Sequence, residues 1–181
     1  PLVRTLAWSG AASDLAKTAL GEQARPVRIL FFDKNPDANW SVPYHQDLTI
    51  AVRERVEIEG YRPWTVKAGI PHVQPPAGVL ENMVAVRLHL DPCGEENGPL
   101  RVLPTTHTLG RLDHTRIESL VQSGTEIAVT APQGAAILMR PLLLHASSPA
   151  RTPSHRRVLH IEYAAVNLPA PLDWHLARPL S

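Results

Sequence analysis

The chain has 181 residues, and its 18 Lys and Arg residues against 17 Asp and Glu residues give a formal net charge of +1. This balance offers no basic surface for nucleic acid, and the apolar stretches are too short and too often interrupted to cross a membrane. The single cysteine excludes an internal disulfide and a cysteine-rich zinc site.

From these properties we expect one domain over residues 1–181, located in the reducing cytoplasm, as a monomer or a weak homodimer. Position 1 is Pro rather than Met, so we expect the sequence to be a fragment or a processed form. The 18 prolines are roughly twice the average usage and are scattered along the chain, which works against long helices. Short strands joined by turns are the natural alternative.

The first predicted elements are a helix and a strand. A helix is expected over residues 14–20, with Ser13 as its N-terminal cap and Gly21 as its stop. Residues 27–32 are dense in branched and aromatic side chains and predict a buried strand.

Further along, residues 48–56 are again typical of a strand. Residues 60–78 hold many Pro and Gly residues and predict a long surface loop, a kind of segment that often forms a lid or a binding loop. A brief helical turn is expected at residues 79–83.

Residues 84–91 alternate apolar and other side chains with period two, which predicts a strand with one fully apolar face. Arg87 and His89 lie on its other face. The simplest interpretation is that these two side chains meet solvent. The alternative is that the apolar face packs outward against a second layer, so that Arg87 points into the interior.

The remaining predicted elements are mainly strands, with one helix at residues 111–122 that ends before Gly124. The strands are expected at residues 100–103, 125–130, 134–140, 142–147 and 157–166. Many short strands with few helices indicate a β-sandwich or barrel rather than a parallel α/β sheet.

The triplet His45-Gln46-Asp47 is the first feature that carries chemistry. In an extended segment His45 and Asp47 project to the same side, so both can reach one metal ion. His145 follows three leucines that carry it toward the interior. Each feature alone has a simpler explanation, a surface His–Asp contact or a core histidine, but two imidazoles and one carboxylate together are the facial ligand set of non-haem Fe(II).

Arg156 comes eleven residues after His145 and opens the next predicted strand. If the two strands pair antiparallel across a turn, both side chains can face one cavity. A guanidinium binds carboxylates in a bidentate manner, which is what a dicarboxylate cosubstrate of the metal would need. Taken alone, Arg156 beside Arg157 would be an ordinary solvated basic turn.

Three motifs in this order resemble those of the phytanoyl-CoA dioxygenase family of Fe(II)/2-oxoglutarate oxygenases. They are the His45-Gln46-Asp47 triplet, the run from Asn97 to His107 (Asn-Gly-Pro-Leu-Arg-Val-Leu-Pro-Thr-Thr-His), and His145-Ala146-Ser147 followed by Arg156. The resemblance covers about residues 27–165. Thr106 departs from the family pattern, where Gly and Ser are commoner.

The resemblance implies a mainly β fold, a double-stranded β-helix (jelly roll) with a few short flanking helices. Its core would span residues 27–166, and residues 1–26 would be the remnant of an N-terminal helical region. The iron ligands implied are His45, Asp47 and His145, and no catalytic residue is implied beyond this metal centre.

The resemblance also implies a site for 2-oxoglutarate, which with Fe(II) and O2 completes the cofactor set. Arg156 would hold the far carboxylate of 2-oxoglutarate and Ser147 would assist it. Lys34 matches a lysine that also approaches this cosubstrate, although Asn35 replaces the proline that follows it in relatives.

The activity implied is hydroxylation of a small organic substrate with release of succinate and CO2. Arg87, Trp64 and Thr49 are the candidate substrate-binding residues, with Trp40 and the loop at residues 60–78 nearby. A buried Arg87 would need an anion, so an acidic substrate is expected. The alternatives are a non-oxygenase cupin-like metal-binding protein or isomerase, and a binding module without turnover. The first would not need Arg156, and the intact triad of His45, Asp47 and His145 argues against the second.

Overall fold

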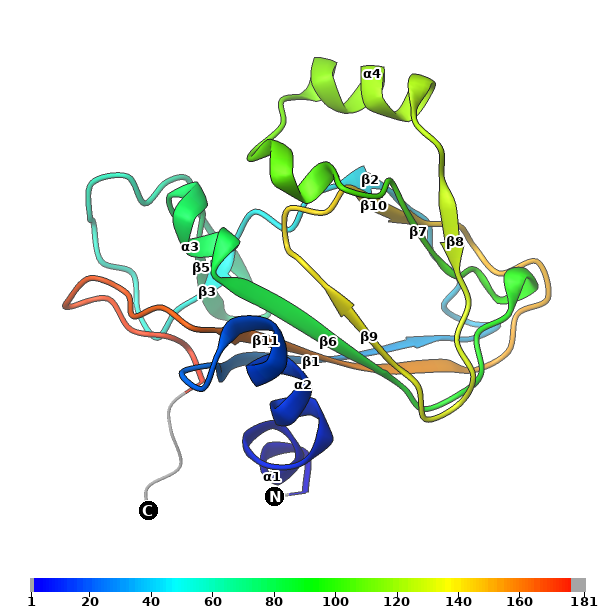
Figure 1. The fold of residues 1–181 in the computed structure, drawn as a ribbon, viewed down its shortest axis with the longest axis horizontal. Coiled ribbons are helices and arrows are strands. Elements are labelled where there is room, and N and C mark those ends of the chain that lie inside the picture. The colour runs from blue at the N-terminus through cyan, green and yellow to red at the C-terminus, as the bar shows by residue number, and fades with distance from the viewer. Residues whose placement is uncertain (1, 177–181) are drawn as a thin grey trace.

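Two four-stranded antiparallel sheets face each other across the interior of the structure, which is a computed structural model that describes residues 2–176 (Figure 1). The first sheet has the order β1-β11-β6-β9 and contains β1 (Arg25–Lys34), β11 (Arg156–Ala164), β6 (Met83–His89) and β9 (Ala136–Met139). The second has the order β2-β10-β7-β8 and contains β2 (Val42–His45), β10 (His145–Ser147), β7 (Leu100–Val102) and β8 (Ile127–Val129). This confirms the expected jelly roll.

A third, smaller sheet of β3 (Ile50–Ala51), β5 (Ile70–Val73) and β4 (Trp64–Lys67) extends the molecule beside the two large ones. The predicted loop at residues 60–78 was therefore wrong, because it contains a hairpin. Ala68 and Gly69 both have positive φ (50° and 78°), the geometry of a tight two-residue hairpin turn. The predicted strand at residues 48–56 shrinks to two residues.

The helices are short and lie outside the sheets: α1 (Leu2–Trp8), α2 (Ala11–Leu20), α3 (Ala77–Glu81), α4 (His114–Ser123) and the 3-10 helices Glu95–Asn97 and Thr106–Leu109. Helix α1 was not predicted as a separate element, although it lies within the region 1–26 for which the resemblance implied helices. Ser13 does not cap α2 but lies buried within it, because the chain turns at Gly10, whose φ is 97°. Gly21 ends α2 as predicted. Within residues 2–176, none of the helices is long and apolar enough to cross a membrane.

Helices α1 and α2 cover the outer face of the first sheet. Val84 and Val86 of β6 and Ile161 of β11 pack against alanines of these helices. The apolar face of β6 therefore points outward, and Arg87 and His89 are buried on the inner face. The simplest interpretation, in which these two side chains met solvent, was wrong, because the N-terminal helices supply a second layer.

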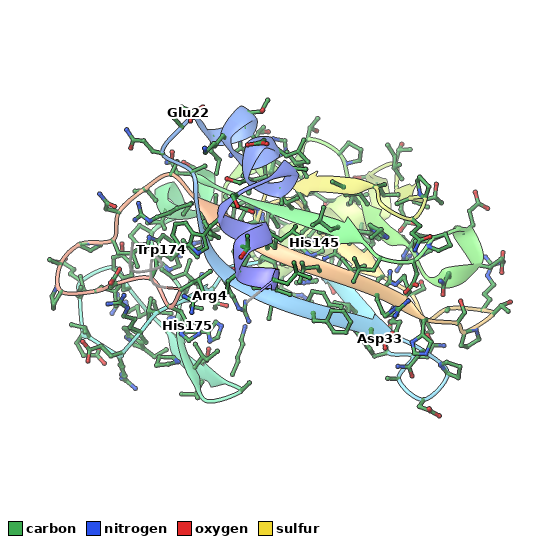
Figure 2. The ribbon with its side chains drawn as sticks, turned by 90° about the horizontal axis from the view of Figure 1, so that it is seen from below. Arg4, Glu22, Asp33, His145, Trp174 and His175 are labelled. Atoms are coloured by element: carbon green, nitrogen blue, oxygen red, sulfur yellow. The ribbon has the colours of Figure 1, made fainter. Side chains whose placement is uncertain are left out.

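A separate apolar core joins the small sheet, α3 and the chain near Trp174. The Trp174 indole donates a hydrogen bond to Val166 O at 3.1 Å. This core lies at the end of the molecule opposite Asp33, with His145 between them (Figure 2).

Candidate metal centre and adjoining cavity

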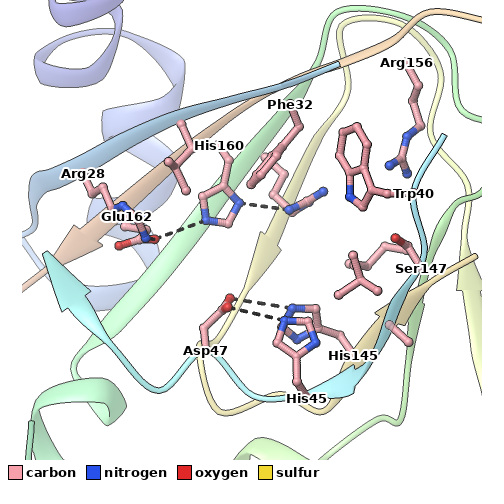
Figure 3. Close-up of a pocket in the computed structure, with 15 residues that line it drawn as sticks. Arg28, Phe32, Trp40, His45, Asp47, His145, Ser147, Arg156, His160 and Glu162 are labelled. Carbon is pink, nitrogen blue, oxygen red and sulfur yellow. Dashed lines mark hydrogen bonds and ion pairs between the residues drawn. The ribbon is translucent and has the colours of Figure 1, made fainter. Parts of the chain in front are cut away.

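His45 and His145 are brought together by strand pairing. His45 ends β2, His145 opens β10, and the two are direct register partners in the antiparallel ladder. Asp47 follows two residues after His45, and its backbone N–H donates to Pro141 O at 2.8 Å. Figure 3 shows the Asp47 carboxylate turned toward both imidazoles.

The three side chains present a compact set of ligand atoms. The Asp47 oxygens lie 3.7 Å from His45 Nε2 and 3.7 Å from His145 Nε2, and all three ligand atoms fall within 4.8 Å of one another. His145 is buried, whereas His45 and Asp47 are half-buried. Among the described residues, this is the one cluster of His, Cys, Asp or Glu side chains that could hold a metal ion.

The tautomers of both histidines suit metal binding. His45 Nδ1 lies 2.9 Å from Pro43 O, and His145 Nδ1 lies 2.8 Å from Leu143 O. A carbonyl only accepts, so each Nδ1 carries the proton and each Nε2 keeps a free lone pair. Burial lowers the pKa of His145, which favours the neutral form. Two neutral nitrogens and one carboxylate on one side of an open space fit Fe(II).

The side chain of Gln46, the middle residue of the triplet, points away from those of His45 and Asp47. Its hydrogen bonds hold the triplet segment in place. Its amide nitrogen donates to Gly110 O at 2.9 Å and to Leu142 O at 2.7 Å, and its amide oxygen accepts from the N–H of Leu112 at 2.9 Å. Sequence reasoning missed this role. The only signal was a polar residue between two candidate ligands in an extended segment.

A cavity of about 190 Å³ adjoins the three ligands and lies between the two large sheets. Arg156 lines one end of it, at the start of β11. Its Nη1 donates to Gly98 O at 2.6 Å, while its buried Nε has no partner within residues 2–176. Ser147, at the end of β10, lies at the same end of the cavity (Figure 3).

Lys34 joins Arg156 and Ser147 there. It is the register partner of Arg156, and its buried Nζ donates to Ser147 Oγ at 3.2 Å and to Ser148 O at 2.7 Å. Burial, followed by the charge of Arg156, lowers the pKa of Lys34 to about 8. The structure thus gathers all three predicted cosubstrate residues at one place.

The way in which Arg156 reaches this place differs from the expectation. Strands β10 and β11 do not pair with each other, because both edges of β10 are taken by β2 and β7. Residues 148–155, with prolines at 149 and 153, cross from one sheet to the other. His145 and Arg156 therefore belong to opposite walls of the cavity.

Arg87 lines the cavity from the middle of β6. Its Nη1 donates to His160 Nδ1 at 3.0 Å, and its guanidinium lies 5.7 Å from the centroid of the Phe32 ring. Burial, followed by the charge of Arg156, lowers the pKa of Arg87 to about 10, so the side chain remains charged at neutral pH.

His160, Glu162 and Arg28 also line the cavity, and sequence reasoning missed them. His160 and Glu162 alternate along β11 with the apolar residues Leu159 and Ile161, the same period-two pattern that marked Arg87 in β6. That pattern could have identified them. Arg28 is the register partner of Glu162 on β1.

Trp64 and Thr49 do not line the main cavity. The Trp64 ring packs against the separate apolar core near Trp174 and lies 5.6 Å from the guanidinium of Arg55, because its strand belongs to the small sheet. The expectation for Trp64 is therefore corrected. Thr49 accepts a hydrogen bond from Lys67 at 3.0 Å and lines only a small neighbouring cavity behind Asp47. Trp40, by contrast, lines the main cavity.

Two comparisons with known proteins concern the amino-acid sequence. A family model described as phytanoyl-CoA dioxygenase matches residues 5–158. No curated protein sequence matches the chain.

Three solved structures with a similar fold have comparable sequence identities and TM-scores to this chain. EvdMO1 has 22% identity and a TM-score of 0.64, with 88% of this chain and 32% of that chain covered. AviO1 from Streptomyces viridochromogenes Tue57 has 24% identity and a TM-score of 0.61, with 88% and 59% covered. EctD from S. alaskensis with bound Fe has 21% identity and a TM-score of 0.65, with 98% and 57% covered. The chain thus spans less than two thirds of the length of each.

Proposed function

Because the chain belongs to the phytanoyl-CoA dioxygenase family, we propose that it is a dioxygenase that uses Fe(II) and 2-oxoglutarate to hydroxylate a small organic acid, with release of succinate and CO2. One observation carries the proposal. The three metal-ligand side chains and the buried, anion-free guanidinium of Arg156 line a single cavity.

His45, Asp47 and His145 would hold the iron from one side. Bound Fe(II), together with 2-oxoglutarate, supplies the oxidation of the substrate by O2. The protein contributes neutral imidazoles, whose Nδ1 protons are held by backbone carbonyls, and one carboxylate that offsets part of the metal charge. Retention of the carboxylate at Asp47 favours hydroxylation over halogenation, which in relatives goes with its absence.

Arg156, Lys34 and Ser147 would bind the distal carboxylate of 2-oxoglutarate. Arg156 has no carboxylate partner in the described part of the chain, and a desolvated guanidinium calls for one. Lys34 adds a second positive charge and orients the Ser147 hydroxyl. A metal-binding isomerase would have no use for such a cationic end, which argues against that alternative.

Arg87 would bind an acid group of the primary substrate. With one carboxylate of 2-oxoglutarate at the metal and the other at Arg156, the Arg87 guanidinium would still have no carboxylate partner among residues 2–176. The cavity volume of about 190 Å³ is below the ~300–1,000 Å³ usual for drug-sized ligands. We infer that the substrate is small, or that only its reacting end enters.

The test is anaerobic loading of the purified chain with Fe(II) and 2-oxoglutarate, followed by a screen of small acids in air. A weak visible charge-transfer band and acid-stimulated succinate formation are expected. Absence of the band, with no succinate formed, would overturn the proposal.

For the setting in which the protein acts we propose the cytoplasm and a monomer or weak homodimer. The single cysteine, Cys93, is buried and unpaired, which suits a reducing compartment.

A further inference from the structure

A row of charged and polar side chains crosses the inner face of the first sheet, opposite Asp47 (Figure 3). Arg28 is the register partner of Glu162, and Arg87 is the register partner of His160. All four side chains line the main cavity. None of the four belongs to the proposed metal site or to the proposed 2-oxoglutarate site. Arg87 alone has a proposed role, which is to bind the acid group of the primary substrate.

The contacts within this row have a fixed direction. Arg87 Nη1 lies 3.0 Å from His160 Nδ1, and an arginine only donates, so the imidazole proton is on Nε2. His160 Nε2 faces Glu162 Oε1 at 3.8 Å, and Arg28 Nη1 donates to the same Oε1 at 3.1 Å. Both contacts therefore fall on one carboxylate oxygen. Among residues 2–176, the hydrogen bond and ion pairs of the Glu162 carboxyl all fall on Oε1.

The hydrogen bonds within this row do not satisfy all of its buried polar atoms, as a purely structural network would. A buried ion pair stabilises a fold only when its remaining polar atoms are also satisfied, and an apolar pair of similar size would cost less. Here Arg28 Nε and Arg87 Nε are buried without partners among residues 2–176, and the carboxyl of Glu162, which lines the cavity, accepts one hydrogen bond from these residues, at Oε1. Burial raises the pKa of Glu162 to about 7, against the opposing charge of Arg28, so this carboxyl gains from an added donor.

We propose that Glu162 is a second anchoring group for the primary substrate, which is accordingly a short bifunctional acid. Its carboxylate lies on Arg87, and a hydrogen-bond donor on the same molecule, an ammonium or a hydroxyl group, lies on Glu162 Oε2. This inference rests on the proposed function for the position of the acid group.

His160 explains why two separate substrate groups are needed. Its imidazole stands between Arg87 and Glu162, so that one small functional group cannot contact both. Burial, followed by the charge of Arg87, lowers the pKa of His160 to about 3, and the ring stays neutral. The imidazole acts as a spacer that sets the distance between the two substrate groups.

The experiment is calorimetric titration of the Mn(II)- and 2-oxoglutarate-loaded chain with matched ligands. Butanoate, pentanoate and hexanoate are each compared with their ω-amino and ω-hydroxy forms. At one chain length, a substituted acid should bind about tenfold tighter than the unsubstituted acid, since a hydrogen bond to a charged group is gained. A tighter amino form identifies an ammonium, and a tighter hydroxy form a hydroxyl. No preference at any length overturns the inference without the need for a variant.

Glu162→Gln then tests the assigned residue. It should remove the preference for the substituted acid, so that the substituted and unsubstituted acids bind with equal affinity. The matched control is Glu126→Gln, which removes a half-exposed carboxylate that pairs with Arg101 at 3.0 Å outside the cavity. A preference retained in Glu162→Gln, or lost equally in the control, overturns the assignment. The Fe(II)–2-oxoglutarate band of the parent chain tests the proposed function separately, so the two failures are distinguishable.

Discussion

His45 and His145 stand directly opposite each other on neighbouring strands, with their ring centroids 4.2 Å apart. Residues opposite each other in an antiparallel pair are the closest cross-strand neighbours that a sheet offers. The ladder thus holds two of the three proposed metal ligands at a fixed spacing. Asp47 is placed by the hydrogen bond from its own backbone to Pro141.

Asp47→Ala should abolish tight Fe(II) binding, because it removes the only anionic ligand. The loss should exceed the roughly 10–100-fold that removal of an outer hydrogen-bond partner costs. Anaerobic iron titration and the visible band with 2-oxoglutarate measure it. Asp37→Ala, at an exposed aspartate, is the control and should behave as the parent does. Full turnover in Asp47→Ala would refute the ligand assignment.

Arg156→Ala should raise the KM for 2-oxoglutarate strongly, because truncating one partner of a desolvated charge pair costs on the order of 2–5 kcal/mol. Arg156→Lys should recover part of the loss, since a lysine cannot reproduce the bidentate fork. The neighbouring Arg157 is half-exposed and pairs with Asp91 at 2.6 Å, so Arg157→Ala should leave this KM unchanged. The reverse pattern would contradict the assignment.

Arg87→Ala should separate the two halves of the reaction. Succinate formation stimulated by an acid from the screen should be lost, whereas the slower decarboxylation of 2-oxoglutarate without substrate should persist. Both rates are measured on the same iron-loaded sample. Equal loss of both would assign Arg87 to the cosubstrate instead.

The affinity for 2-oxoglutarate should fall as the pH rises through about 8, because Lys34 then loses its proton and its positive charge. Below that pH the ammonium is present and favours the bound carboxylate. Lys34→Arg keeps the charge and should flatten the profile between pH 7 and about 9, the range in which an arginine does not titrate. Titrations at several pH values check this. An identical fall in the variant would assign the effect to another group.

Gln46→Ala should weaken both the fold and the metal site, because it leaves the polar groups of Gly110, Leu112 and Leu142 without their partner. One such loss costs about 1–3 kcal/mol. Thermal unfolding and iron titration measure the two effects. Gln133→Ala removes a single exposed hydrogen bond to Leu90 O and should change neither. An unchanged iron affinity in Gln46→Ala would restrict the residue to a structural role.

Local patterns were sufficient for much of the candidate site. The spacing of His45 and Asp47 and the alternation through residues 84–91 depend only on the period of a strand, which repeats every second residue wherever the strand lies. The end of α2 at Gly21 also follows from the chain alone. These properties need no knowledge of the rest of the fold.

The partners of each strand were decided only by the tertiary structure. The local sequence near residue 145 does not predict that β10 pairs with β2 and β7, or that β11 lies in the opposite sheet. The meeting of Arg28 with Glu162 and of Arg87 with His160 follows from that choice of partners. Pairing between distant strands depends on the packing of all of them at once, whereas the direction of each side chain depends on its own strand. The sequence therefore determined which chemical groups the site could contain, and the fold determined which of them face one another.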